Sequence, residues 1–347
     1  GSRSTFTLGQ FGGHAGRALR SGDVLRLDQA QSPEPQSLPA PMLPAISEHW
    51  TLRVIYGPHG APDFFTPGDI DKLFEHEWEV HYNSSRTGVR LIGPKPEWAR
   101  ETGGEAGLHP SNIHDNAYAF GTVDFTGDMP VILGPDGPSL GGFVCPATII
   151  AADLWKLGQL KAGAKLRFQA VSLQQAVALE AEQDSAIERL SKLPEILVED
   201  KPPGSPIVKT SMLNRDEVVY RLAGDHFLLV EIGPLELDIE RRFKVHALML
   251  WLQDNLLQGM RELTPGIRSL QVHYDSQQLS VDALLAHIDL ACRQLADAEQ
   301  LRVPARVVHL PLSWDDDACR LAIEKYIQSV RPDAPWCPSN LEFIRRI

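Results

Sequence analysis

The stretch AYAFGTVDFTGDMPVIL, residues 117–133, contains two short strand-like runs at residues 117–125 and 131–133. Glycine, proline, asparagine or aspartate bounds each run, and these residues favour turns. Similar runs lie on both sides of this stretch, at residues 50–56, 79–82, 89–92 and 165–171. Many short strands separated by turn residues are typical of a closed or nearly closed β-barrel. We therefore predict that the first part of the chain is mainly β.

The pattern changes after residue 193. Residues 194–211 mix prolines, a glycine and charged side chains, which indicates a linker. Beyond it, alternating apolar patterns predict strands and helices in the order β-β-α-β-α-β, at residues 218–222, 227–232, 239–257, 269–274, 280–295 and 305–310. This order predicts a small ferredoxin-like α+β fold. We expect a barrel domain at 1–193, a linker at 194–211 and an α+β domain at 212–347, with two last helices at 315–330 and 339–347.

Composition narrows the class of protein. The chain has 347 residues, of which 43% are hydrophobic and 22% charged, as in ordinary globular proteins of about two domains. The formal net charge of −12 argues against nucleic-acid binding, which needs lysine and arginine. No apolar run approaches the roughly 20 residues of a membrane-spanning helix. The four cysteines form no C-x-x-C pair, so we expect reduced thiols and a cytoplasmic location.

Two patterns suggest ligands but lack the required spacing. His76 and His81 flank Glu77 but lie five residues apart, where a metalloprotease helix needs four, so we expect no metal site. Residues 12–16, Gly-Gly-His-Ala-Gly, lack the strand–turn–helix context of a phosphate-binding loop. A tight turn is the simpler interpretation.

Residues 112–118 are the first candidate for chemistry. Asn112, His114, Asp115 and Tyr118 are concentrated in what we expect to be a loop just before a strand. Loops on a rigid scaffold often carry function, and histidine beside aspartate can form an orienting pair. However, adjacent residues of an extended segment point to opposite faces, so His114 and Asp115 are not expected to reach the same substrate atom. The residues alone leave both a functional and a structural role open.

Residues 134–143 are the second candidate. This stretch has four glycines and two prolines in ten residues. Such a composition suits a backbone that approaches another group closely or offers N–H groups to an oxyanion. The alternative is an elaborate barrel hairpin, and both interpretations stay open.

Specific strings resemble a known family. Residues 83–94, NSSRTGVRLIGP, resemble the S-N-R-x-G-x-R-L-x-G-P signature of KipA-like proteins, also called allophanate hydrolase subunit two. Residues 134–160 resemble that family's glycine-pair segment, although Leu140 stands where a threonine is frequent. Residues 224–231 and 265–275 resemble the KipI-like partner, allophanate hydrolase subunit one. A KipA-like half fused ahead of a KipI-like half resembles the carboxyltransferase domain of urea carboxylases and urea amidolyases, as do residues 112–115, 125–142 and 331–340.

This resemblance implies a cyclophilin-like barrel followed by a truncated ferredoxin-like unit, with further sequence missing at both ends. It implies a carboxyltransferase that moves a carboxyl group from carboxybiotin to urea and so forms allophanate. Biotin is expected on a biotinyl carrier domain, and ATP and bicarbonate at a biotin carboxylase domain. These partner domains are absent, so the chain alone is not expected to turn over urea. The alternatives are a Kip-type amidase component related to 5-oxoprolinase, and a non-catalytic Kip-type binding module.

The resemblance also suggests roles by position. Asp115 and Asn112 are expected to grip urea, while His114 and Tyr118 orient it or handle a proton. Asp136 and Ser139 are expected on the pocket floor. The glycine pair Gly141 and Gly142 is expected to offer N–H donors to the biotin oxygen. These roles require residues 112–118 and 134–143 to share one hollow.

Overall fold

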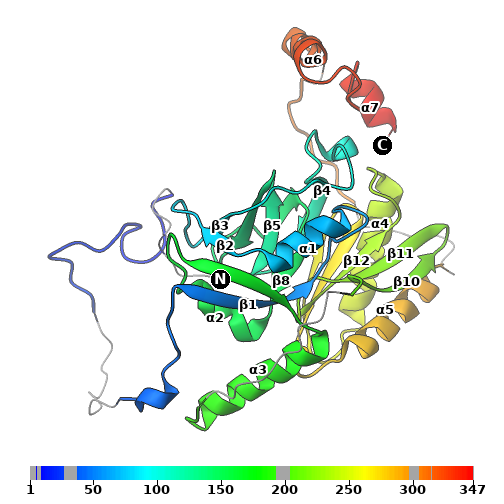
Figure 1. Ribbon diagram of the computed structural model, residues 1–347. Helices are drawn as coiled ribbons and strands as arrows, with labels where there is room; N and C mark the ends of the chain where they lie inside the picture. The colour runs from blue at the N-terminus through cyan, green and yellow to red at the C-terminus, as the bar shows by residue number, and fades with distance from the viewer. Residues whose placement is uncertain are drawn as a thin grey trace.

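The computed structural model describes residues 5, 9–26, 37–192, 204–296, 305–313 and 315–346 (Figure 1). Its first part is a closed β-barrel with the strand order β1-β8-β5-β6-β3-β2-β9. The barrel strands are β1 (His49–Tyr56), β2 (Trp78–Val80), β3 (Gly88–Ile92), β5 (Thr122–Thr126), β6 (Met129–Leu133), β8 (Ala147–Ile149) and β9 (Lys165–Ala170). Closure joins β1 to β9 in parallel, while the other barrel pairs are antiparallel. The predicted barrel is confirmed.

The barrel interior is a dry apolar core. Leu52, Val54, Val123 and Ile132 are completely buried, and they belong to one cluster with Trp78 and other large side chains. Inward and outward residues alternate along β1, as the period of two in a strand requires. The barrel is therefore filled by side chains and is not a channel.

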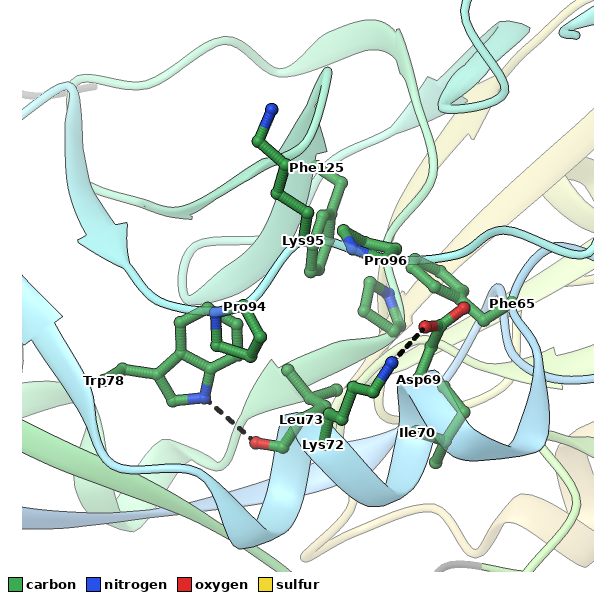
Figure 2. Close-up of a pocket in the computed structure, with 11 residues that line it drawn as sticks. Phe65, Asp69, Ile70, Lys72, Leu73, Trp78, Pro94, Lys95, Pro96 and Phe125 are labelled. Carbon is green, nitrogen blue, oxygen red and sulfur yellow. Dashed lines mark hydrogen bonds and ion pairs between the residues drawn. The ribbon is translucent and has the colours of Figure 1, made fainter.

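Helix α1 (Pro67–Glu75) covers one side of the barrel. The Thr66 hydroxyl accepts a hydrogen bond from the Asp69 N–H, and the Asp69 carboxylate accepts one from the Thr66 N–H, which is a capping box. The small hollow beside α1 is closed by Trp78 and Pro94 (Figure 2). Its volume is about 10 Å³, enough for about one water molecule, so it cannot hold a substrate.

Two strands form a separate ladder beside the barrel, β4 (Asn112–Ala117) and β7 (Leu140–Phe143). Residues 112–117 are thus a strand and not the loop that we predicted. The single strand predicted at residues 117–125 is also wrong, because the chain turns after Ala117 and β5 begins only at Thr122. The Thr122 N–H bonds the Ala119 carbonyl, which closes the turn between them.

The second part is a five-stranded antiparallel sheet in the order β10-β11-β12-β14-β13. Its strands are β10 (Ile207–Leu213), β11 (Asp216–Leu222), β12 (Phe227–Ile232), β13 (Met260–Pro265) and β14 (Ser269–Tyr274). Helices α4 (Ile239–Asp254) and α5 (Val281–Ala296) share one core cluster with the sheet. The chain is therefore a barrel plus an α+β unit, the predicted class.

Two details of this part differ from prediction. The strand expected at residues 305–310 does not form, since no strand pairs with it and Val307 is 84% exposed. Strand β13, which we did not predict, occupies the sheet edge next to β14. Strand β10 begins at Ile207, before the expected end of the linker, and residues 193–203 lie outside the described part of the chain.

The remaining elements lie outside these sheets, and the longest of them, α3 (Leu173–Glu188), runs below the barrel in Figure 1. They are α2 (Leu154–Leu157), α6 (Asp317–Ser329) and α7 (Asn340–Arg346), with 3₁₀ turns at Ala40–Met42, Gly104–Ala106 and Ala151–Asp153. Among the described helices, none has the length and apolar character to span a bilayer. All four cysteines are free thiols, as predicted.

His226 links the two parts. It lies between β11 and β12, and its Nε2 is 2.9 Å from Oε2 of Glu180 on α3. Its Nδ1 is 3.1 Å from the Tyr274 carbonyl oxygen. Burial lowers the pKa of His226, but the hydrogen bond to Glu180 and the charges of Asp225 and Glu180 outweigh burial and raise the pKa to about 9. The imidazolium and Glu180 therefore form an ion pair across the contact.

We expect this ion pair to make stability depend on pH. An unfolded histidine titrates near 6.5, so the contribution of His226 is complete below that pH and is lost as pH rises through about 9. The loss should be roughly 3 kcal/mol of unfolding free energy. Urea denaturation between pH 6 and 10 measures it, with His226→Gln as the matched variant that cannot titrate.

The same region holds other charged and titratable groups. Asp225, His273 and Asp275 lie close enough to act on His226 or Glu180. Burial lowers the pKa of His273, so this histidine titrates below the pH range in which His226 loses its proton. Equal pH slopes for the unchanged chain and His226→Gln between pH 7 and 9.5 would contradict the ion pair.

Candidate functional site

The two candidate segments lie side by side. In the ladder of β4 and β7, Asn112 is opposite Phe143, Asn116 is opposite Gly141 and Ala117 is opposite Leu140. The register shifts between Asn112 and Asn116, which marks a bulge. Residues 112–118 and 134–143, far apart in the sequence, thus form one unit.

Tyr118 holds this unit together. Its hydroxyl accepts a hydrogen bond from the Phe143 N–H at 2.9 Å, and its N–H donates to the Ser139 carbonyl at 2.9 Å. A Cβ at Gly141 would lie 2.2 Å from the Tyr118 ring, so glycine is required there for close packing. Burial raises the pKa of Tyr118, which stays neutral. These contacts give Tyr118 a packing role.

Other predicted site residues also have local partners. Asn112 Oδ1 accepts a hydrogen bond from the His109 N–H at 3.1 Å and so closes a turn. Asp136 pairs with Arg86 at 2.8 Å, and the Ser139 residue is exposed. Gly142 packs against the Ile113 carbonyl, which would lie 2.9 Å from an added Cβ.

The glycine-rich segment uses several of its N–H groups internally. The N–H groups of Gly134 and Asp136 donate to the carbonyls of Thr87 and Arg86, and the Gly137 N–H donates to the Gly134 carbonyl. These donors, like that of Phe143, already have acceptors. They are not available to an oxyanion.

His114 and Asp115 instead face the second part of the chain. Asp115 Oδ1 accepts a hydrogen bond from the Ile267 N–H at 3.1 Å. A Cβ on Gly266 would lie 2.6 Å from the same oxygen, so only glycine allows this approach. Both side chains contact the second part, and the register shift of β4 between Asn112 and Asn116 interrupts the strand alternation on which our expectation of opposite faces rested.

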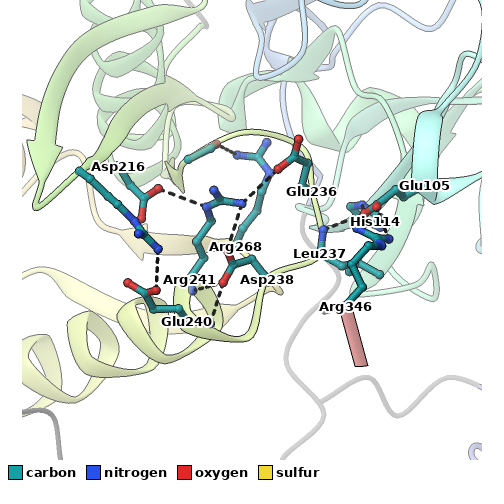
Figure 3. Close-up of polar contacts among 12 residues, drawn as sticks. Glu105, His114, Asp216, Glu236, Leu237, Asp238, Glu240, Arg241, Arg268 and Arg346 are labelled. Atoms are coloured by element: carbon teal, nitrogen blue, oxygen red, sulfur yellow. Dashed lines mark hydrogen bonds and ion pairs between the residues drawn. The ribbon is translucent and has the colours of Figure 1, made fainter. Parts of the chain in front are cut away.

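His114 is buried at this junction, with 8% of its side chain exposed. Its Nε2 has no hydrogen-bond partner and lies 3.8 Å from Oε2 of Glu105 (Figure 3). Burial lowers the pKa of His114, and the charge of Arg268 lowers it too, although Glu105 and a backbone hydrogen bond to Leu235 act in the other direction. His114 is therefore neutral at pH 7.

Glu105 is itself held in place. Its Oε2 accepts a hydrogen bond from the Leu237 N–H at 3.0 Å, and its Oε1 accepts one from Arg346 on α7 at 2.5 Å. Figure 3 shows these groups converging around His114 from both parts of the chain. The Glu105 carboxylate therefore bonds Leu237 and Arg346, and His114 Nε2 has no hydrogen-bond partner.

Three charged side chains lie buried below the junction. Glu231 on β12 accepts hydrogen bonds from Arg221 Nε at 2.6 Å and from Arg268. Burial raises the pKa of Glu231, but the charges of Arg268 and Arg221 outweigh burial and hold the pKa at about 2. Arg221 also reaches Asp63 at 2.8 Å, and Arg268 donates to the Gly233 carbonyl at 2.8 Å. The network therefore fixes the segment next to Ile267 against the barrel.

Sequence reasoning missed this network. Arg221 and Glu231 lie within strands that we predicted, but their pairing depends on the register of β11 and β12. Arg268 directly follows Ile267 in a string that drew attention only by resemblance. A charged residue at an inward position of a predicted strand is the only signal that could have pointed to it.

One described group of side chains has the composition of a metal site. Ligand atoms of Glu180, Asp225 and His226 lie within 4.8 Å of one another. However, the ring nitrogens of His226 already lie at hydrogen-bond distance from the Tyr274 carbonyl and the Glu180 carboxylate. The ion pair accounts for the group.

Family models match both parts of the chain. The model for "Carboxyltransferase domain, subdomain A and B" matches residues 1–170, and that for "Carboxyltransferase domain, subdomain C and D" matches residues 218–346. The chain belongs to the carboxyltransferase domain family. His114 and Asp115 lie in the first match and Ile267 and Arg268 in the second, so the junction unites the two halves of a carboxyltransferase domain.

Similar proteins agree with this family. The chain is 41% identical to the urea amidolyase of Lachancea kluyveri over 366 residues, a match to all of the chain and 20% of that protein. The crystal structure of the Kluyveromyces lactis urea carboxylase is 39% identical with a TM-score of 0.82, over 99% of the chain and 32% of that structure. A 5-oxoprolinase subunit of Haemophilus influenzae is 29% identical over 55% of the chain and 58% of that protein. The chain thus spans about a fifth of the urea amidolyase that it matches.

Proposed function

We propose that the chain is the carboxyltransferase part of a biotin-dependent urea carboxylase of the cytoplasm. In this role it moves the carboxyl group of carboxybiotin onto urea and forms allophanate. The similarity to urea amidolyases over the whole chain supports this substrate. The 5-oxoprolinase match extends over 55% of the chain, which makes an amidase component the weaker candidate.

The observation that carries the proposal is the meeting of His114 and Asp115 with the segment of Ile267 and Arg268. Both family segments are present in this chain, and residues of each meet at this site. The site also pairs a neutral base with a carboxylate. Urea presents N–H groups, and both side chains offer acceptors for them.

Asp115 and His114 have different roles in the proposed reaction. Asp115 uses Oδ1 for the Ile267 N–H, and its second carboxylate oxygen is an acceptor for an N–H of urea. His114 is neutral, and its Nε2 is an acceptor without a partner. As a urea nitrogen gains the carboxyl group it loses a proton, and His114 Nε2 is the base that takes it.

Carboxybiotin, when bound, supplies the carboxyl group, and its release leaves negative charge on the biotin ring. Arg268 follows Ile267 directly in the sequence, and its positive charge acts on His114. The same charge favours an anion near His114 without any rearrangement.

The test uses the full-length protein that carries this chain, with its carrier domain biotinylated. We expect urea to stimulate ATP cleavage and allophanate to form. Asp115→Asn should lower urea-dependent turnover at least tenfold, because asparagine that keeps its oxygen on the Ile267 N–H presents an NH2 donor to the N–H groups of urea. Bicarbonate-dependent ATP cleavage without urea should stay unchanged, and Asp317→Asn, on the exposed surface of α6, is the matched control. If urea does not stimulate ATP cleavage by the unchanged protein and no allophanate forms in its presence, the proposal is refuted.

A further inference from the structure

A second hollow lies on the barrel, away from the residues of the junction. It has a volume of about 560 Å³, which is within the range of small-molecule sites. The turn between β2 and β3 forms one wall, and α2 with the residues after it forms the other. Gly134 and Pro135 complete the lining, so the glycine-rich segment contributes to this hollow and not only to the ladder with β4.

The floor of this hollow is apolar. Val89 and Leu157 are buried beneath it, and Trp155 is partly exposed beside them. Phe120 is 39% exposed and Tyr82 is 82% exposed, both at its edge. Large aromatic side chains that stay exposed around a concave surface favour a bound apolar body.

The basic side chains of the lining stand beside the hydroxyls of Tyr82, Ser84 and Ser85. They include His81, Arg86 and Lys161, and none of the lining residues is acidic. The His81 Nδ1 accepts the Asn83 N–H at 3.0 Å, so Nε2 carries the proton of the neutral ring and is a donor. The hollow therefore offers donors and cations to a ligand that must supply acceptors.

The cations are held by ion pairs that a ligand can replace. Lys161 lies 2.6 Å from Glu48, and both side chains are more than 60% exposed. Arg86 pairs with Asp136, which brings one of the predicted site residues to this rim. Exposed pairs contribute only about 0–1 kcal/mol, so a carboxylate on a ligand can take the place of Glu48 at little cost.

We propose that this hollow binds an apolar molecule that carries a carboxylate. The apolar body lies over Trp155 and Phe120, and the carboxylate meets Lys161 and His81 at the rim. A free organic acid presents this chemistry, whereas carboxybiotin belongs to the site proposed at the junction. The site stands on its own residues and does not depend on the role proposed for the junction.

The test compares two probes that differ only in charge, 4-phenylbutyrate and its amide. Ligand-observed NMR titration of the chain should give at least tenfold tighter binding for the acid. Lys161→Met should weaken the acid about fivefold and leave the amide unchanged, because the variant keeps an apolar stem and loses only the charge. Phe120→Ser should weaken both probes.

Controls keep the result interpretable. Lys325→Met makes the same charge change on the exposed surface of α6 and should have no effect. Thermal unfolding of each variant verifies that the barrel is intact. Biotinyl-lysine amide carries no carboxylate, so it should not displace the acid. Equal affinity for acid and amide, or unchanged binding in Lys161→Met and Phe120→Ser, would overturn the proposal.

Discussion

Glu231→Ala will lose about 3–5 kcal/mol of unfolding free energy, the largest stability effect that we expect in this chain. The glutamate is 5% exposed and is the carboxylate that Arg221 and Arg268 share. Its removal leaves Arg268 without the carboxylate that it binds and Arg221 with Asp63 alone, so the cost of burying the two charges is less well offset. Urea denaturation followed by circular dichroism measures the loss. The control is Glu217→Ala on the exposed face of β11, expected within about 0.5 kcal/mol of the unchanged chain.

A triple variant distinguishes the loss of charge pairing from the loss of packing around Glu231. Replacing the whole network by Glu231→Leu, Arg221→Met and Arg268→Met should restore much of the stability, since apolar side chains of similar volume need no partner. If Glu231→Ala unfolds within about 1 kcal/mol of the unchanged chain, the two arginines reach water in the folded state. The junction would then lack the rigid support that we assign to it.

His114→Gln in the full-length protein will lower kcat for urea-dependent ATP cleavage by about 10²–10⁴-fold. Glutamine fills similar space and keeps hydrogen bonding, but it cannot take a proton. Because His114 is neutral and its pKa lies below the ordinary 6.5, the unchanged protein should retain its rate below pH 6.5 and lose it only as His114 becomes protonated. His114→Gln should lose this acidic limb of the pH profile.

Steady-state kinetics distinguish this role from a structural one. The KM for bicarbonate and ATP should stay unchanged, because those substrates act elsewhere in the proposed protein. His309→Gln, at an exposed position, is the matched control. A His114→Gln variant with normal kcat and a normal pH profile would make His114 a packing residue of the junction.

The sequence determined the barrel and the helix starts because their causes are local. Turn residues bound the strands, and Thr66 caps α1 through Asp69 three positions later. Both depend on residues close together in the chain. The family strings also predicted, correctly, that a barrel and an α+β unit belong to one carboxyltransferase domain.

Predictions from local sequence patterns failed where pairing with a distant strand decides the secondary structure. Residues 112–117 lack strand alternation and were predicted as a loop, but β7 pairs with them and the second part of the chain covers His114 and Asp115. Residues 305–310 have the alternating pattern of a strand and found no partner strand. A strand needs an edge to bond to, and neighbouring residues do not reveal whether one exists.

The tertiary structure places the predicted site residues at three separate locations. Tyr118, Asn112 and Gly141 pack the ladder, Asp136 and its ion pair with Arg86 stand at the rim of the barrel hollow, and His114 and Asp115 face the junction. The sequence by itself therefore determined the fold class and the polar residues available for chemistry. Only the tertiary structure decided that Asp115 meets Ile267, 152 positions away, and that Glu231 holds two arginines beneath them. The physical reason is that burial and charge pairing are properties of groups that folding brings together, and no local pattern along the chain records them.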